Sequence, residues 1–274
     1  MTLRADEALV RAGLAETIEL ANAYIMEGRV LCGTQKILKP SEKVKDAGQL
    51  RVKGGTDDYV SRGAHKLKKA FEVFAISAEG KNCIDVGAST GGFTDVMLRM
   101  GAQRVYCIDV GYNLLDWKLR SDKRVTVMEK TNARFLTKDL FDTEITFGAT
   151  DVSFISLKAI LPAVYSVLTE NADFIVLIKP QFEAPKEDVG EKGVVRDPAV
   201  HARVTGEIID FAEETGFEVK GLDYSPIRGP EGNIEFLLHL LPRTDGNDDI
   251  NEKLINDIVM AAYDNFSKSP RGDL

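Results

Sequence analysis

The sequence predicts an α/β protein in which a doubly wound, mostly parallel sheet follows a small α+β unit. With 274 residues, of which 44% are hydrophobic, the chain is long enough for one large and one small domain, each with its own core. From Tyr59 onward, short apolar runs alternate with amphipathic stretches, which is typical of strands joined by helices. Before that point the elements are shorter and the turns tighter. The chain therefore divides into two regions of different architecture.

The first region begins with two short helices. Apolar side chains recur at helical spacing over residues 4–12 and 17–27, and a glycine lies at or just beyond the end of each stretch. Short strand-like runs at residues 30–32 and 50–52 come next and are joined by tight turns. This region is small but large enough to fold as a unit.

The second region alternates strands with helices. The predicted strands lie near residues 82–86, 105–109, 125–129, 146–151, 174–178, 217–224 and 234–241. Helices are expected around residues 93–100, 112–119, 133–140, 157–168, 198–215 and 250–266. The last strand is expected to be antiparallel, because only a short loop separates it from its predecessor. The expected boundaries are residues 1–56 for the small domain, 57–60 for a linker, 61–242 for the larger domain and 243–274 for a C-terminal tail with one helix.

Composition excludes several classes of protein. No unbroken apolar run approaches the roughly 20 residues that a membrane-spanning helix needs. The three cysteines, Cys32, Cys83 and Cys107, are odd in number and far apart, so we expect reduced thiols in a cytoplasmic protein. The three histidines are not spaced with cysteines or acids as metal ligands are, which argues against a metal site.

Charge is distributed unevenly along the chain. The formal net charge is -8, yet the first 69 residues carry a surplus of four positive charges. Only this N-terminal part is suited to a polyanion such as RNA. The alternative is that these basic residues form an ordinary solvated surface, and charge alone does not decide between the two.

A glycine-rich segment carries the clearest chemical signal. Residues 83–94 read Cys-Ile-Asp-Val-Gly-Ala-Ser-Thr-Gly-Gly-Phe-Thr, so an apolar strand ends in an acid and a helix starts after a loop of small residues. Free N–H groups at the helix start then face a ligand above the strand ends. The next strand ends in Asp109, which can hold the two hydroxyls of a ribose. The pattern lacks dinucleotide and phosphate-loop spacing and suits S-adenosylmethionine; the alternative is a glycine-rich turn without a ligand.

Four further charged residues have informative positions. Asp151 and Lys179 end two predicted strands, and ligands of open α/β sheets bind at this edge. Lys66 lies in the helix before the first strand, and Glu235 lies near the start of the last strand. For any one of the four, a structural ion pair is the alternative interpretation. Trp117, the only tryptophan, is expected in the core or in the wall of the cofactor pocket.

These motifs resemble those of the TlyA (haemolysin A-type) family, which joins an S4 RNA-binding domain to an FtsJ-like 2′-O-methyltransferase domain. The resemblance runs from about Arg4 to Leu241. It is most specific at residues 61–67 (Ser-Arg-Gly-Ala-His-Lys-Leu), 85–94, 131–134 (Thr-Asn-Ala-Arg), 151–157 (Asp-Val-Ser-Phe-Ile-Ser-Leu), 178–183 (Ile-Lys-Pro-Gln-Phe-Glu) and 229–235 (Gly-Pro-Glu-Gly-Asn-Ile-Glu). It implies a Rossmann-like class I fold that uses S-adenosylmethionine to methylate the ribose 2′-OH of cytidine in ribosomal RNA or ribosomal subunits.

The resemblance also implies residue roles. The catalytic tetrad would be Lys66, Asp151, Lys179 and Glu235. The cofactor-binding residues would be Asp85, Gly87, Ala88, Ser89, Thr90, Gly91, Gly92, Phe93, Asp109, Asn132 and Asp151. The RNA-binding residues would be Arg4, Arg11, Arg29, Lys39 and Arg62.

Chemistry supplies a reason for such a tetrad. A ribose 2′-OH is a poor nucleophile at neutral pH and needs a group that positions it and takes or stabilises its proton. A lysine can do this if a nearby cation and partial burial lower its pKa. Lys66 could act on Lys179 in this way, and which lysine gives up its proton stays open. Two rival functions are a pore-forming haemolysin, disfavoured by the absence of a long apolar element, and a catalytically degenerate RNA-binding protein, disfavoured because the tetrad is complete.

Overall fold

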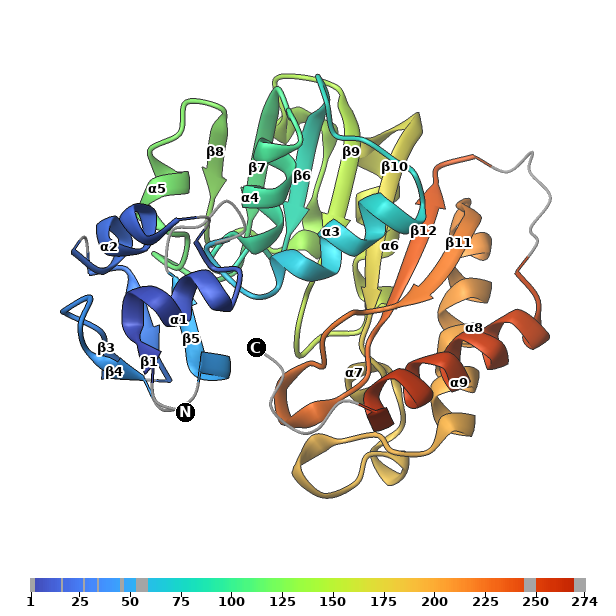
Figure 1. Cartoon of the computed structure of the whole chain (residues 1–274). Coiled ribbons are helices and arrows are strands. Elements are labelled where there is room, and N and C mark those ends of the chain that lie inside the picture. The colour runs from blue at the N-terminus through green and yellow to red at the C-terminus, as the bar shows by residue number, and fades with distance from the viewer. Residues whose placement is uncertain are drawn as a thin grey trace. The chain divides into compact units, whose positions relative to one another are not determined.

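The chain forms two compact units, residues 1–58 and 59–274, seen in a computed structural model (Figure 1). The structure describes residues 3–15, 17–26, 28–33, 35–44, 47–52, 59–243 and 250–268. Residues 57 and 58 of the expected linker lie outside this set. The two remaining linker residues are held by the larger unit, because the Val60 N–H donates to Asp95 Oδ2 at 3.0 Å and the Tyr59 ring lies under the Arg99 guanidinium.

The smaller unit packs two helices against short strands. Helices α1 (Ala5–Arg11) and α2 (Ile18–Met26) agree with the predicted helices. Strand β2 (Val30–Cys32) pairs antiparallel with β3 (Gln35–Lys36) and β5 (Leu50–Val52), and β1 (Leu3–Arg4) pairs with β4 (Lys43–Val44). Leu9, Ile25 and Val30 are buried in a core that this unit builds by itself.

The larger unit is built on a seven-stranded sheet in the order β11-β12-β10-β9-β6-β7-β8. The strands are β6 (Asn82–Val86), β7 (Arg104–Ile108), β8 (Val125–Met128), β9 (Ile145–Thr150), β10 (Leu168–Ile178), β11 (Glu218–Tyr224) and β12 (Phe236–Leu241). Strands β6 to β10 pair in parallel, whereas β12 is antiparallel to both of its neighbours, β10 and β11. The predicted doubly wound sheet with an antiparallel last strand is therefore confirmed.

Helices cover both faces of this sheet (Figure 1). They are α3 (Ala64–Val73), α4 (Gly92–Arg99), α5 (Trp117–Arg120), α6 (Leu161–Val167), α7 (Pro180–Glu183), α8 (Pro198–Thr215) and α9 (Glu252–Lys268). Since successive strand residues point to opposite faces, Cys83 packs into the core with α3 and α4, and Ile84 into the core with α6, α8 and α9. The helix expected in the C-terminal tail is thus part of the larger unit's core.

Two predicted helices are wrong. Residues 112–119 contain only the first three residues of the short α5, and residues 133–140 form two 3₁₀ turns, Ala133–Phe135 and Lys138–Leu140. Asn113 has a φ of +58°, which interrupts a helix. The apolar residues of these stretches do not share one buried face, because Leu115 and Leu136 are buried whereas Leu114 and Leu140 are exposed. Trp117 is also not where we expected it: 76% of it is exposed.

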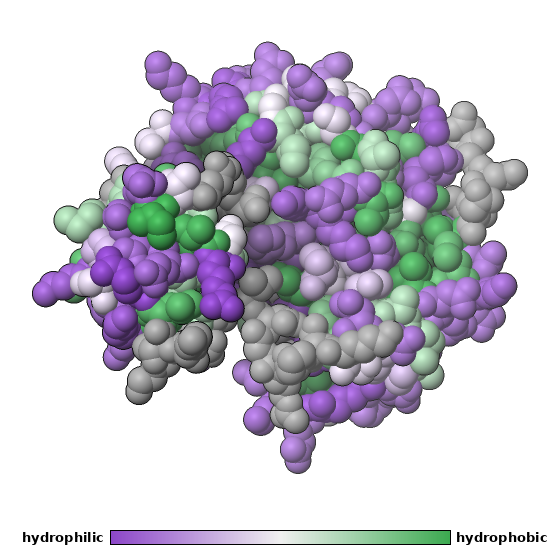
Figure 2. Space-filling model, viewed as in Figure 1, coloured by the Kyte–Doolittle hydropathy of each residue, from purple (hydrophilic) through white to green (hydrophobic). Residues whose placement is uncertain are grey.

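Within the described ranges no helix is both long and apolar enough to cross a bilayer. Side chains on the face drawn in Figure 2 are mainly hydrophilic, with apolar ones in scattered patches. Cys83 and Cys107 are buried free thiols, as expected, and Cys32 is partly buried.

Candidate active site

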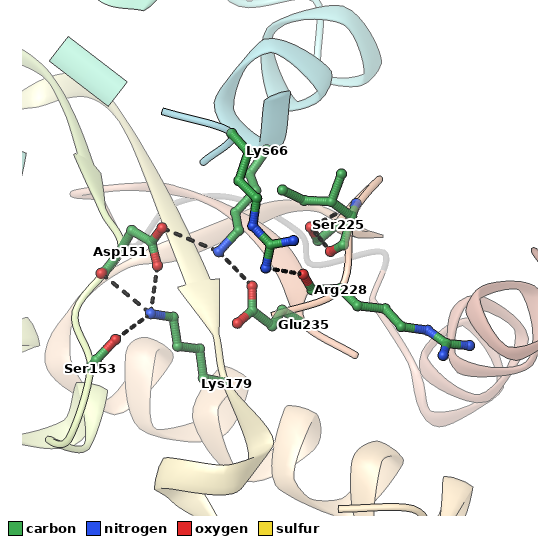
Figure 3. Close-up of polar contacts among 9 residues, drawn as sticks. Lys66, Asp151, Ser153, Lys179, Ser225, Arg228 and Glu235 are labelled. Atoms are coloured by element: carbon green, nitrogen blue, oxygen red, sulfur yellow. Dashed lines mark hydrogen bonds and ion pairs between the residues drawn. The ribbon is translucent and has the colours of Figure 1, made fainter. Parts of the chain in front are cut away.

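Four charged side chains from distant parts of the chain meet at the carboxyl edge of the parallel strands (Figure 3). Asp151 directly follows β9, and Lys179 directly follows β10. Because β12 runs the other way, the residue just before its start, Glu235, reaches the same edge. Lys66 comes from the first half of α3. We call these four residues the charged cluster.

The charged cluster is one alternating chain of cations and anions. Lys66 Nζ lies 2.6 Å from Glu235 Oε2 and 3.2 Å from Asp151 Oδ2. Lys179 Nζ lies 2.6 Å from Asp151 Oδ1 and donates to Ser153 Oγ at 2.8 Å. Asp151 therefore bridges the two lysines, and removal of any member changes the partners of the others.

Burial controls the electrostatics of this cluster. Lys66 and Lys179 are each 6% exposed, and Glu235 is fully buried. Burial raises the pKa of Glu235. Burial alone would lower the pKa of Lys66, but the attraction of Asp151 and Glu235 outweighs it, so the net shift of the Lys66 pKa is upward. Lys66 therefore keeps its proton and stays a cation next to Asp151.

One buried carboxylate oxygen of the cluster has neither a hydrogen bond nor an ion-pair partner among the described residues. Glu235 Oε1 is buried and accepts no hydrogen bond from the described residues. It lies against Gly229, where a Cβ atom would be only 2.2 Å from it, so any side chain at that position would displace the carboxylate. An unsatisfied buried carboxylate oxygen costs stability, which makes this a place to look for function.

The glycine-rich loop after β6 has the conformation that its residues predict. Gly87 and Gly91 have positive φ angles of +83° and +96°, and α4 starts at Gly92. A Cβ atom at Gly87 would lie 3.2 Å from the Val152 backbone nitrogen. A Cβ atom at Gly91 would lie 2.3 Å from Leu119 Cδ1, so Gly91 is needed for packing. The loop approaches its neighbours so closely that only glycine fits at these positions.

The two strand-ending acids have different surroundings. Asp85 is 1% exposed and accepts hydrogen bonds from the Thr94 N–H at 2.9 Å and the Thr94 hydroxyl at 2.6 Å, which fixes the start of α4. Burial raises the pKa of Asp85 to about 7. Asp109 accepts from the Ser89 N–H at 2.8 Å and the Gly111 N–H at 2.7 Å and lines a cavity. Each Asp109 oxygen has a second lone pair left for a ligand hydroxyl.

Two cavities meet at the charged cluster. One has a volume of about 440 Å³; its lining includes Asp109, Asn132 and Phe154 and apolar walls from Ile108, Leu114 and Ile160. The other has a volume of about 290 Å³, and its lining includes Lys66, Lys179, Arg62, Asp85, Ala88, Thr90, Gly92 and Phe93. Gly87, Ser89, Asp151 and Ser153 line both cavities. Of the predicted cofactor residues, only Gly91 lines neither.

Sequence reasoning missed Phe154. It follows Asp151 by three residues, has a φ of +63° and is 91% exposed. Its ring centroid lies 5.0 Å from that of Phe182. A large aromatic side chain in a left-handed conformation is strained, and such strain persists where neighbours enforce it. The available signal was an aromatic residue just after Asp151 and Ser153, at the end of a strand where ligands bind.

The predicted RNA-binding residues lie in both units. In the smaller unit Arg11 and Lys39 are exposed, Arg29 stacks on the Tyr24 ring at 4.3 Å, and Arg4 donates two hydrogen bonds to Asp6. In the larger unit, Arg62 lines the smaller cavity and donates to the Arg228 carbonyl at 3.1 Å.

Comparison with known proteins identifies the family. Residues 59–241 match the profile of the FtsJ-like methyltransferases, and residues 3–50 match the S4 domain. The chain belongs to the FtsJ-like methyltransferase family. It is 44% identical over 243 residues to the 16S/23S rRNA (cytidine-2′-O)-methyltransferase TlyA of Mycobacterium tuberculosis, covering 88% of this chain and 91% of that one.

Other relatives carry a different name. Hemolysin A of Brachyspira hyodysenteriae is 40% identical over 240 residues, covering 87% of this chain and 100% of that one. A Streptococcus thermophilus protein solved under the description hemolysin is 45% identical, with a TM-score of 0.76 over 97% of this chain and 98% of that one. The predicted combination of an S4-like domain and a Rossmann-like methyltransferase is confirmed, and so are the enzyme class and S-adenosylmethionine as cofactor.

Proposed function

We propose that this chain transfers a methyl group from S-adenosylmethionine to the ribose 2′-hydroxyl of a cytidine in ribosomal RNA. The observation that carries the proposal is the junction of the two cavities at Gly87, Ser89, Asp151 and Ser153. With its nucleoside in the larger cavity and its sulfonium end at the glycine-rich loop, where the two cavities join, the donor would present its methyl group to an acceptor beside the buried lysines. The choice of cytidine rests on relatives named rRNA (cytidine-2′-O)-methyltransferases.

The larger cavity fits the cofactor chemically. Asp109 offers free lone pairs for two ribose hydroxyls, and the apolar walls suit an adenine ring. When bound, S-adenosylmethionine supplies an electrophilic sulfonium methyl group. Asp85 fixes the loop and the start of α4 through its Oδ2, which accepts both hydrogen bonds from Thr94, and this residue lines the smaller cavity.

The charged cluster would prepare the acceptor. Lys179 Nζ, held by Asp151 and Ser153, orients the 2′-oxygen and takes or stabilises its proton. Lys66 stays protonated between Glu235 and Asp151 and keeps Asp151 in place. The exposed Phe154 ring offers a stacking surface for the base of a nucleotide that has left its helix.

The smaller unit would anchor the RNA. Its exposed Arg11 and Lys39, together with the positive balance of the first 69 residues, suit phosphate contacts on ribosomal RNA or a ribosomal subunit. The proposal requires neither a membrane nor a metal ion and places the enzyme in the cytoplasm. The assembled charged cluster favours an active enzyme over a degenerate RNA-binding protein.

The test is methyl transfer to defined RNA. Purified full-length protein is incubated with labelled S-adenosylmethionine and with free rRNA or ribosomal subunits from cells that lack the gene, and ribose methylation is mapped by mass spectrometry of nuclease fragments. We expect a 2′-O-methylated cytidine. An Arg11→Ala/Lys39→Ala variant should bind the RNA more weakly and with a reduced salt dependence, while cofactor binding stays unchanged. Methylation of a base, or of no ribosomal RNA at all, would overturn the proposal.

A further inference from the structure

The segment after β9 carries much of the site but has little regular structure of its own. Residues 151–156 form neither helix nor strand, yet they include Asp151, Ser153 and Phe154. Phe154 holds a strained, left-handed conformation with its ring exposed. A segment like this keeps one conformation only if neighbouring elements hold it. We call residues 151–157 the acceptor loop.

One turn of chain contacts the acceptor loop at three successive places. This turn is α7 together with Lys179, which precedes it. At its start, Lys179 Nζ binds Asp151 and Ser153. In its middle, the Phe182 ring packs against the Phe154 ring. At its end, Glu183 Oε2 accepts from the Ser156 hydroxyl at 2.6 Å and Glu183 Oε1 accepts from the Leu157 N–H at 2.8 Å.

The contacts made by Glu183 stand out because neither is an ion pair. Both of its carboxylate oxygens are committed to neutral donors at the far end of the acceptor loop, where a 3₁₀ turn (Leu157–Ala159) begins. Burial raises the pKa of this carboxyl group. Lys179 and Glu183 are four residues apart, which places both on one side of a helical turn. The α7 turn thus holds the acceptor loop at both ends, with Ser153 and Phe154 between the two anchors.

We infer that Glu183 is a positioning residue for methyl transfer: its two hydrogen bonds fix the far end of the acceptor loop, so that Ser153 stays on Lys179 and Phe154 stays presented beside the cavity junction. The inference rests on the proposed function for its kinetic consequence only. Its structural half, that Glu183 orders residues 151–157, is independent of the acceptor's identity. A misplacement of about 1 Å at a reacting centre lowers rates by about a hundredfold, so a loosened loop has a measurable cost.

The experiment compares Glu183→Ala, Glu183→Gln and Ser156→Ala in the full chain. Glutamine can keep both hydrogen bonds, because its Oε1 can accept from the Leu157 N–H while its amide donates to the Ser156 oxygen. Glu218→Ala is the matched control: Glu218 is 3% exposed and also binds two donors, but it lies at the opposite edge of the sheet. Two readouts are hydrogen exchange of the peptide that covers residues 151–160 and the single-turnover rate of methylation.

Glu183→Ala should raise hydrogen exchange at the Leu157 amide and lower the methylation rate by about tenfold or more. Its affinity for the cofactor should fall by a smaller factor. Glu183→Gln should stay within about threefold of wild type in both readouts, and Ser156→Ala should fall between them. Glu218→Ala should leave both readouts at their wild-type values. Unchanged exchange in Glu183→Ala would overturn the inference, and so would a Glu183→Gln variant as impaired as Glu183→Ala. Because exchange needs no RNA, a failure of the proposed function would show in the rates alone.

Discussion

The antiparallel pair of strands β10 and β12 carries a lysine–carboxylate cluster at each end, and the two clusters differ in the burial of their lysines and in the hydrogen bonding of their carboxylates. At the end opposite the site, Asp173 of β10 accepts from Lys81 Nζ at 2.5 Å and lies 2.9 Å from His239 Nε2 of β12. In this cluster both carboxylate oxygens therefore have partners, and the side chains of the ion pair are partly exposed, that of Lys81 by 27%.

At the other end Lys179 directly follows β10, and Glu235 directly precedes β12. Here both lysines and Glu235 are buried, and the Asp151 side chain is 20% exposed where a cavity opens onto the group. Glu235 Oε1 lacks a hydrogen bond from the described residues. A buried ionic group of this kind is a poor source of stability. The difference indicates that the cluster around Asp173 serves the fold and the charged cluster serves the reaction.

The largest expected effect is the difference in methylation rate between variants that lack the lysine at one end of the strand pair and variants that lack the lysine at the other. Lys179→Ala should lower the single-turnover methylation rate by roughly 10²-fold or more, in line with general-base contributions of about 10²–10⁴. Lys81→Ala should leave the rate unchanged, since its partner Asp173 is remote from both cavities. Lys179→Arg should not restore the rate, because a guanidinium cannot give up its proton. A near wild-type arginine variant would mean that position 179 supplies only positive charge.

The sequence predicted the site unevenly, and the reason is geometric. Asp151 and Lys179 could be placed from the pattern alone, because each ends a strand of a parallel sheet. Lys66 and Glu235 come from a helix and from the start of an antiparallel strand, so they needed the family resemblance. Phe154 and Glu183 depend on backbone torsion angles and tertiary contacts that residue spacing does not encode.

The same limit explains the two wrong helices. Apolar residues at helical spacing suggested helices at residues 112–119 and 133–140, but only some of them, such as Leu115 and Leu136, are buried. These segments instead follow the ends of β7 and β8, and residues of both line the larger cavity. Loops that must shape a pocket bury side chains one at a time, and periodicity cannot distinguish this from a short helix.

The second contrast is the sign of the pH dependence at the two ends. Burial raises the pKa of Glu235, so its contribution to stability is present below its unfolded pKa of about 4.5 and is lost as the pH rises. Although burial opposes it, the hydrogen bonds from His239 and Lys81 lower the pKa of Asp173, so its contribution is present above about 3.8 and is lost as the pH falls.

Urea unfolding between about pH 3 and pH 7 tests these signs. The stability difference between wild type and Glu235→Gln should decrease with rising pH, and that between wild type and Asp173→Asn should increase. At pH 7 the Asp173→Asn loss should be about 1.5–3 kcal/mol, as expected for hydrogen bonds to a charged group. If both stability differences changed with pH in the same direction, the two ends of the strand pair would not differ in the sign of their pH dependence.

The smallest effect concerns salt. The Lys81–Asp173 pair is partly exposed, and such pairs contribute about 0.2–1 kcal/mol, so Lys81→Ala should lower the melting temperature by at most about 4 °C at low salt. Raising the ionic strength from about 0.05 M to about 0.5 M should shrink this difference, since the Debye length falls well below 10 Å. Lys66→Met leaves the fully buried Glu235 carboxylate without its cation, a loss that salt should screen little because this side chain is 0% exposed. If the melting point of the Lys66 variant recovered with salt as that of the Lys81 variant does, the charged cluster would be exposed to solvent like its counterpart, and the contrast between the two ends would fail.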